Sequence, residues 1–101
     1  MSLKKQYNKT NSDCKVTFRL SKELAEEANY VFLAGDFNNW DTQNTPLKKL
    51  KSGEFSVTLN LQKGQEYQFK YLVNGKEWLN ELDADKNVIN EFQTENSVVV
   101  V

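Results

Sequence analysis

The sequence contains no histidine, one cysteine and one proline among its 101 residues. Without histidine, the chain cannot form a histidine-based catalytic triad or a Cys–His dyad. The common zinc sites built from histidine and cysteine are excluded for the same reason. Cys14 cannot form an internal disulfide, which favours a reducing compartment and a cytoplasmic location. Because Cys14 begins an alternating apolar stretch, we interpret it as a half-buried structural thiol.

The chain also lacks a long apolar run and a strong net charge. No segment approaches the roughly 18 apolar residues of a membrane helix, and the polar first residues do not read as a signal peptide. We therefore expect no membrane association. The 13 basic and 14 acidic residues are spread along the sequence and give a net charge of −1. This balance argues against a nucleic-acid partner, because phosphate backbones select clustered lysines and arginines.

Apolar residues alternate with polar ones in several short segments, which is the pattern of half-buried β-strands. The expected strands cover residues 14–20, 30–37, 47–51, 54–61, 66–73, 76–79 and 97–101. Turn residues separate these segments, and Asn74–Gly75 is the strongest hairpin signal because both residues tolerate the positive φ of a type I′ turn. Seven or eight short strands with almost no helix predict an all-β fold, an antiparallel β-sandwich.

The remaining segments carry no strand pattern. Residues 1–13 are polar and irregular, so we expect a flexible N-terminal arm followed by one domain over residues 14–101. Residues 21–28 have helical propensity but are too few for an independent helix, so we expect a connecting turn with Ser21 as its cap. Residues 80–96 are polar and irregular.

Acidic residues in the expected loops are the remaining candidates for acid–base or metal chemistry. They are Asp36, Asp41, Glu81, Asp83 and Asp85. A pair of them could serve a small glycosidase, but each also fits a loop residue that accepts bonds from nearby backbone N–H groups. The segment DADKN at 83–87 starts like an EF-hand loop, yet Val88 stands where a glycine is required. We predict no catalytic residue, no metal site and no cofactor.

The two tryptophans do not fit the alternating core pattern. Trp40 lies among turn residues, and Trp78 follows a tight turn. An exposed indole is a flat apolar plate that suits the apolar face of a sugar ring. The alternative is that each tryptophan closes an open end of the sandwich, and composition leaves both interpretations open.

Three segments together carry a recognisable pattern. They read YVFLAGDFNNWDTQNTPLKK, EYQFKYLVNGKEW and TENSVVVV. In combination they resemble carbohydrate-binding module family 48, the glycogen-binding domain of AMP-activated protein kinase β subunits, which also precedes the catalytic barrel of isoamylases and glycogen branching enzymes. The resemblance covers nearly the whole chain, residues 14–101.

This resemblance implies an immunoglobulin-like β-sandwich that is not an enzyme and that binds α-1,4-glucan such as glycogen. Glycogen-binding members stack the glucan on two tryptophans and hold its hydroxyls with a lysine and an asparagine, while an apolar side chain enters the curve of the glucan. The matching residues are Trp40, Trp78, Lys70, Asn96 and Phe92. The alternation agrees with one of them, because Lys70 lies on the strand face opposite the core residues.

One departure from the family pattern concerns Trp78. Two residues separate it from Gly75, where the kinase-subunit pattern has one. Because a one-residue slip turns a strand side chain to the other face, Trp78 faces either the ligand or the core. Since fold does not establish function, two alternatives stay open. The first is a protein-interaction or regulatory domain that has lost sugar binding, with a glycan-active enzyme or another protein as its partner, and the second is a small glycosidase.

Overall fold

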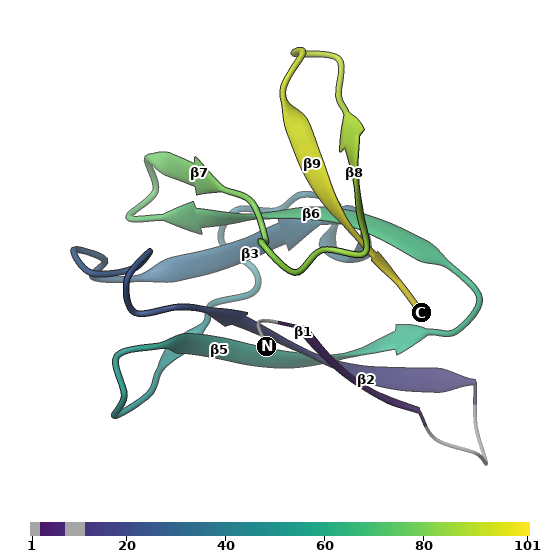
Figure 1. Cartoon of the computed structure of the whole chain (residues 1–101), viewed down its shortest axis with the longest axis horizontal. Coiled ribbons are helices and arrows are strands. Elements are labelled where there is room, and N and C mark those ends of the chain that lie inside the picture. Colours follow the sequence, from purple (N-terminus) through teal and green to yellow (C-terminus); the bar gives the residue numbers. More distant parts are fainter. Residues whose placement is uncertain (1–2, 8–11) are drawn as a thin grey trace.

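The structure is a computed structural model that describes residues 3–7 and 12–101 and consists of two antiparallel sheets (Figure 1). The first sheet contains, in spatial order, β1 (Leu3–Tyr7), β2 (Asp13–Leu20), β5 (Phe55–Gln62) and β4 (Lys48–Lys49). The second contains β3 (Val31–Gly35), β6 (Glu66–Val73), β9 (Glu95–Val100) and β8 (Lys86–Ile89), and β7 (Glu77–Leu79) also pairs with β6. A short 3-10 helix, η1 (Asp36–Asn38), follows β3. The predicted all-β sandwich is confirmed.

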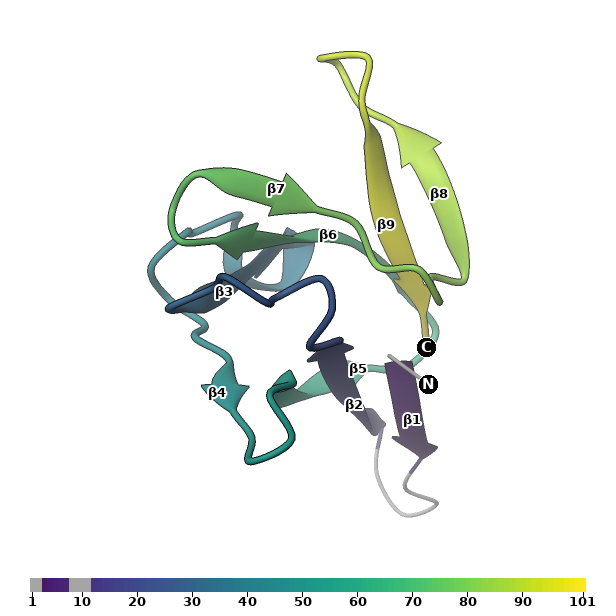
Figure 2. The same cartoon turned by 60° about the vertical axis from the view of Figure 1, so that its left-hand side comes forward.

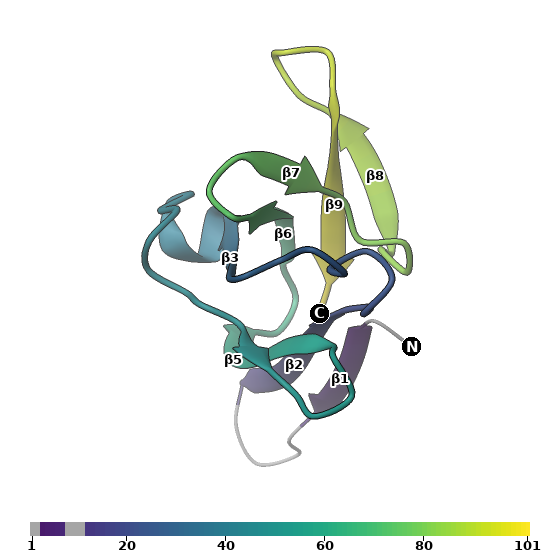
Figure 3. The same cartoon turned by 90° about the vertical axis from the view of Figure 1, so that its left-hand side faces the viewer.

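The two sheets face each other (Figure 3), and their apolar side chains form one core between them. In β2, Val16, Phe18 and Leu20 are buried, while the residues between them are more exposed. Phe69 of β6 meets Phe18 edge-on, with 5.0 Å between the ring centroids. Cys14 was expected to be half-buried but is completely buried in the same core. Strand alternation therefore assigns one face of each sheet to the core and leaves the other face outward.

Strand β1 lies in the segment expected to be a flexible N-terminal arm. Residues 3–7 instead pair along their whole length with β2, and Leu3 is buried. Lys5 also forms an ion pair, at 2.7 Å, with Asp85 in the loop that connects β7 to β8 in the second sheet. The pairing uses the open backbone edge of β2, which needs no apolar alternation in its partner. Residues 1–2 and 8–11 of the predicted arm lie outside the described residues.

Strand β8 falls in the segment expected to be irregular. It pairs with β9 in a hairpin that projects from the body of the sandwich (Figure 2). In β8 only Val88 is half-buried, and the other three residues are exposed. Because the projecting hairpin buries few side chains, the sequence of β8 does not alternate between apolar and polar residues.

The connection from β2 to β3 is the predicted turn. The N–H of Ala25 donates to the carbonyl of Ser21 at 3.0 Å, and the Ser21 hydroxyl accepts from the N–H of Leu24 at 3.3 Å.

Within residues 3–7 and 12–101, no helix is long and apolar enough to cross a membrane.

A buried polar cluster joins β6 to the loop after β7. The Tyr71 hydroxyl donates to Glu81 Oε1 at 2.6 Å, and Glu81 Oε2 accepts from the N–H of Asp83 at 2.8 Å. The N–H of Glu81 donates to the Ser97 hydroxyl at 2.8 Å. Both carboxylate oxygens of Glu81 therefore bind protein groups, which gives this acid a structural task. Burial raises the pKa of Tyr71 well above its ordinary value, and the neighbouring Glu81 carboxylate raises it further.

Replacing Tyr71 with phenylalanine should lower the free energy of unfolding by about 1–3 kcal/mol, because Glu81 Oε1 loses a donor while it stays buried. Urea denaturation at neutral pH measures this change. Tyr30→Phe is the matched control, since Tyr30 is half exposed, and it should change the free energy by less than about 0.5 kcal/mol. Equal effects of the two variants would contradict the assignment.

Stability should also fall at alkaline pH through the same group. In the unfolded chain Tyr71 ionises near its ordinary pKa of 10.0, whereas in the folded protein it stays protonated to higher pH. Its contribution is therefore complete below that value and is lost as the pH rises towards the folded pKa. In an absorbance titration, one of the four tyrosines should ionise only as the circular dichroism of the fold disappears. Ionisation of all four in the folded protein would disprove this.

Candidate functional site

The outward face of the second sheet carries the residues that alternate with the core residues. Tyr67, Phe69 and Tyr71 of β6 pack in or against the core, so Gln68 and Lys70 point outward. Directly opposite residues of antiparallel strands share a face. The register therefore places these further residues on the outward face: Leu72 of β6, Phe32 and Ala34 of β3, Trp78 of β7, and Asn96 and Val98 of β9.

The register of β6 and β7 decides the orientation of Trp78. Val73 pairs with Glu77, so residues 74–76 form the turn between the strands. The first two turn residues have φ of 54° and 69°, as the predicted type I′ turn requires. Trp78 lies opposite Leu72 on the outward face. Trp78 is 45% exposed, so it does not close the core.

Trp40 lies at the other end of the outward face, where β3 continues into η1. Its backbone N–H donates to the carbonyl of Gly35 at 2.8 Å, and its indole Nε1 donates to Asp36 Oδ1 at 3.0 Å. The other oxygen of Asp36 accepts from the backbone N–H of Gln68 at 2.8 Å. The loop approaches β6 closely, since a Cβ on Gly35 would lie 2.5 Å from the carbonyl oxygen of Gln68. One carboxylate therefore fixes the Trp40 ring to β6.

Asn38 determines the path of the chain between β3 and Trp40. Its Oδ1 accepts from the N–H of Gly35 at 3.0 Å, and its Nδ2 donates to the carbonyl of Leu33 and the hydroxyl of Thr45, both at 2.9 Å. Trp40 itself has a φ of 58°, in the left-handed region that bulky residues rarely adopt. These bonds hold the tryptophan in a conformation that the isolated segment would not favour.

A chain of side-chain hydrogen bonds continues from β6 onto the β8–β9 hairpin. Asn96 Nδ2 donates to Gln68 Oε1 at 3.0 Å, and Asn96 Oδ1 accepts from Asn90 Nδ2 at 2.9 Å. Asn90 Nδ2 also donates to the Thr94 hydroxyl at 2.8 Å, and Lys70 Nζ donates to that hydroxyl at 3.3 Å. Lys70 and Asn96 thus belong to one network, which reaches Trp40 through the Asp36–Gln68 bond.

Phe92 lies at the tip of this hairpin and is 77% exposed. Its backbone N–H donates to Asn90 Oδ1 at 2.9 Å, and the following residue, Gln93, has a φ of 61°. Among the interactions of the described residues, none joins the Phe92 ring to the other four predicted site residues. The structure therefore brings Trp40, Lys70 and Asn96 into one network, and places Trp78 on the same face and Phe92 on the projecting hairpin.

Four residues of this network were not among the predicted site residues. They are Asp36, Gln68, Asn90 and Thr94. Gln68 could have been found, because it alternates with core residues on the same strand face as Lys70. Asn90 and Thr94 lie in the connection between β8 and β9. The sequence gives no signal for this hairpin, so it does not indicate these two residues.

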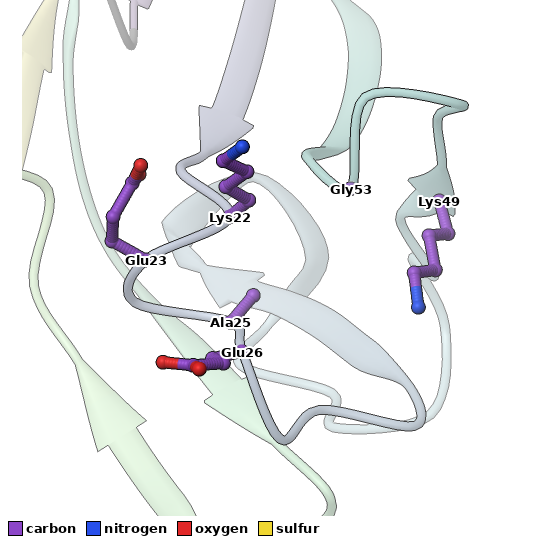
Figure 4. Close-up of a pocket in the computed structure, with 6 residues that line it drawn as sticks. All are labelled: Lys22, Glu23, Ala25, Glu26, Lys49 and Gly53. Carbon is purple, nitrogen blue, oxygen red and sulfur yellow. The ribbon is translucent and has the colours of Figure 1, made fainter.

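A hollow of about 320 Å³ lies elsewhere, between the turn that follows β2 and the β4–β5 hairpin (Figure 4). It is lined by Lys22, Glu23, Ala25, Glu26, Lys49 and Gly53. None of these six residues is aromatic, and four carry opposite charges in equal number. The hollow has no flat apolar plate, so we place the candidate site on the outward face of the second sheet.

The family model described as the glycogen recognition site of AMP-activated protein kinase matches residues 6–101. The chain belongs to this family. A stretch of 40 residues is also 52% identical to a 1,4-alpha-glucan-branching enzyme of Saccharomyces cerevisiae (strain ATCC 204508 / S288c). That alignment covers 39% of this chain and 6% of the enzyme, so the chain spans a small part of the enzyme's length. The family resemblance read from the three sequence segments is confirmed.

If Asp36 orients Trp40, then Asp36→Ala should free the indole ring. In a Trp78→Phe background, Trp40 is the remaining tryptophan of the two, so its signal can be read alone. We expect a weaker near-ultraviolet circular dichroism band and a lower fluorescence anisotropy. Asp41→Ala is the matched control, because Asp41 is an acid of the same loop that accepts from the N–H of Gln43. Spectra of the Asp36 variant identical to those of the control would contradict this role.

Proposed function

We propose that this domain binds an α-1,4-glucan such as glycogen on the outward face of the second sheet and catalyses no reaction. The observation that best supports this function is the hydrogen-bonded network from Trp40 through Asp36 and Gln68 to Asn96 and Lys70. It assembles residues from three distant parts of the chain on one exposed face. Membership in a glycogen-recognition family supports the choice of ligand.

In this proposal the tryptophans supply flat apolar plates. The indole N–H of Trp40 is already bonded to Asp36, so Trp40 offers the face of its ring rather than its donor. Trp78 offers a second plate near the opposite end of the face. Sugar rings present apolar C–H faces that stack on such plates. Because Trp40 is fixed before the ligand arrives, little conformational entropy is lost on binding.

Lys70 and the amides supply hydrogen bonds to sugar hydroxyls. Lys70 is half-buried and its ammonium group has three donor hydrogens, one of which reaches Thr94. Asn96 is 6% exposed, and its amide binds Gln68 and Asn90. We therefore give Lys70 the main polar contact, while Asn96 orients Gln68 and adds a bond from its second amide hydrogen.

Phe92 completes the proposed site. The β8–β9 hairpin rises beside β6, away from the first sheet (Figure 2). Its tip presents the Phe92 ring to solvent, where a curved glucan can wrap around it. An exposed aromatic ring gains most by covering its faces with the apolar interior of such a curve. With so few anchors on an open face, the affinity should be weak, in about the micromolar to millimolar range.

Retardation in a native gel that contains glycogen tests this function. The wild type should be retarded, and Trp40→Ala, Trp78→Ala and Lys70→Ala should each raise the apparent dissociation constant by about tenfold or more. Tyr7→Ala and Lys15→Ala are matched controls, because both residues are exposed on the first sheet, and they should migrate like the wild type. Thermal unfolding of each variant checks that the fold is intact.

Other results would overturn this function or relocate its site. A wild type that glycogen does not retard would contradict sugar binding, and co-purification of a protein partner would then favour an interaction domain. Retardation that survives in both tryptophan variants would place the glucan elsewhere on the molecule. Release of reducing sugar from the glucan would contradict the absence of catalysis.

A further inference from the structure

Three apolar side chains lie side by side across the outward face of the second sheet. Phe32 of β3 pairs with Leu72 of β6, and Leu72 pairs with Trp78 of β7. Among the described residues, the core cluster between the sheets includes none of these three. Leu72 is only 6% exposed although it faces away from this core. Its neighbours therefore cover it and form an apolar surface of their own.

Tyr30 extends this surface beyond the N-terminal end of β3. Its ring meets Phe32 edge-on, with 5.9 Å between the centroids and an interplanar angle of 78°, and Tyr30 is 48% exposed. The carbonyl of Tyr30 accepts from the N–H of Asn74 at 2.9 Å, and Asn74 Oδ1 accepts from the N–H of Tyr30 at 3.3 Å. The turn that orients Trp78 thus also fixes Tyr30. We call Tyr30, Phe32, Leu72 and Trp78 the apolar row.

We propose that the apolar row extends the sugar site from Trp78 to Tyr30, and that Tyr30 stacks on a glucose unit beyond those held by Trp40, Lys70 and Trp78. The inference rests on the proposed function and adds to it a preference for longer linear glucan chains. Continuity supports it: Lys70 and Leu72 are successive outward residues of β6, about 7 Å apart. A sugar chain bonded to Lys70 therefore borders the row.

The size and chemistry of the row favour a sugar over a protein. Stable protein interfaces use about 20–30 residues on each side, whereas the row has four side chains. Two charged residues precede Trp78 in the chain, Lys76 in the adjoining turn and Glu77 at the start of β7. A tyrosine ring combines an apolar face with a hydroxyl at its edge, which suits a ligand whose rings are apolar on the face and polar at the rim.

Calorimetric titration with two glucans of different shape tests the subsite. β-Cyclodextrin is a closed ring and cannot extend along the row, so in this proposal it uses the tryptophans and Phe92 but not Tyr30, whereas a linear maltodecaose can extend along the row. Tyr30→Ala should weaken maltodecaose binding by about three- to tenfold and change β-cyclodextrin binding by less than about twofold. Tyr30→Phe, which keeps the ring, should restore most of the affinity for maltodecaose. Tyr7→Ala is the control for an exposed tyrosine of the first sheet.

Three outcomes would overturn the subsite. Unchanged maltodecaose binding in Tyr30→Ala would remove Tyr30 from the site. Equal weakening for both glucans, with a lower thermal midpoint, would make Tyr30 a structural residue. A change in sedimentation behaviour with unchanged sugar affinity would make the row a contact between copies of the chain. A wild type that binds neither glucan would instead contradict the proposed function itself, and the subsite with it.

Discussion

Side-chain alternation along β6 couples the hydrophobic core of this domain to its candidate ligand face. The strand pairs with β3, β7 and β9, so it is the centre of the second sheet. Its inward residues Phe69 and Tyr71 fill the core, and its outward residues Gln68 and Lys70 enter the polar network. A slip of one residue would exchange these two sets. The burial of the core residues therefore fixes the position of the candidate ligand face as firmly as it fixes the fold.

The loop after β3 is held in place by hydrogen bonds within the protein. Trp40 adopts a left-handed backbone, and Asn39 before it does the same, with φ of 57°. Asn38 and Asp36 compensate for this strain with bonds to β3 and β6. A ring held in this way would lose little freedom on binding, which would help a shallow, open surface to bind the proposed ligand. The strain is local, since no residue of β3 or β4, on either side of the loop, has a positive φ.

The sequence predicted those parts of the fold that depend on burial. The strands around Phe18, Phe55 and Phe69 have apolar residues at alternate positions because one face of each packs in the core. Strands β1 and β8 could not be predicted in this way, since each pairs through its backbone and buries few side chains. The type I′ turn was readable from Asn74–Gly75 because few residue pairs allow positive φ twice.

The candidate site was less accessible to such reasoning, because its geometry depends on bonds between distant segments. The direction in which Trp78 points could be predicted only with the register of β6 and β7, because an extra residue can lie in a turn or in a strand. The role of Asp36 required the path of the loop, which places its carboxylate between an indole and a strand.

Strand β1 has a practical consequence for anyone who shortens this protein. It covers the backbone edge of β2 along five residue pairs, from Leu3–Phe18 to Tyr7–Cys14. A domain cut at residue 14, where the alternating pattern begins, would leave that edge with unpaired N–H and C=O groups. Two such molecules could then join edge to edge, and a preparation made to simplify the protein would aggregate.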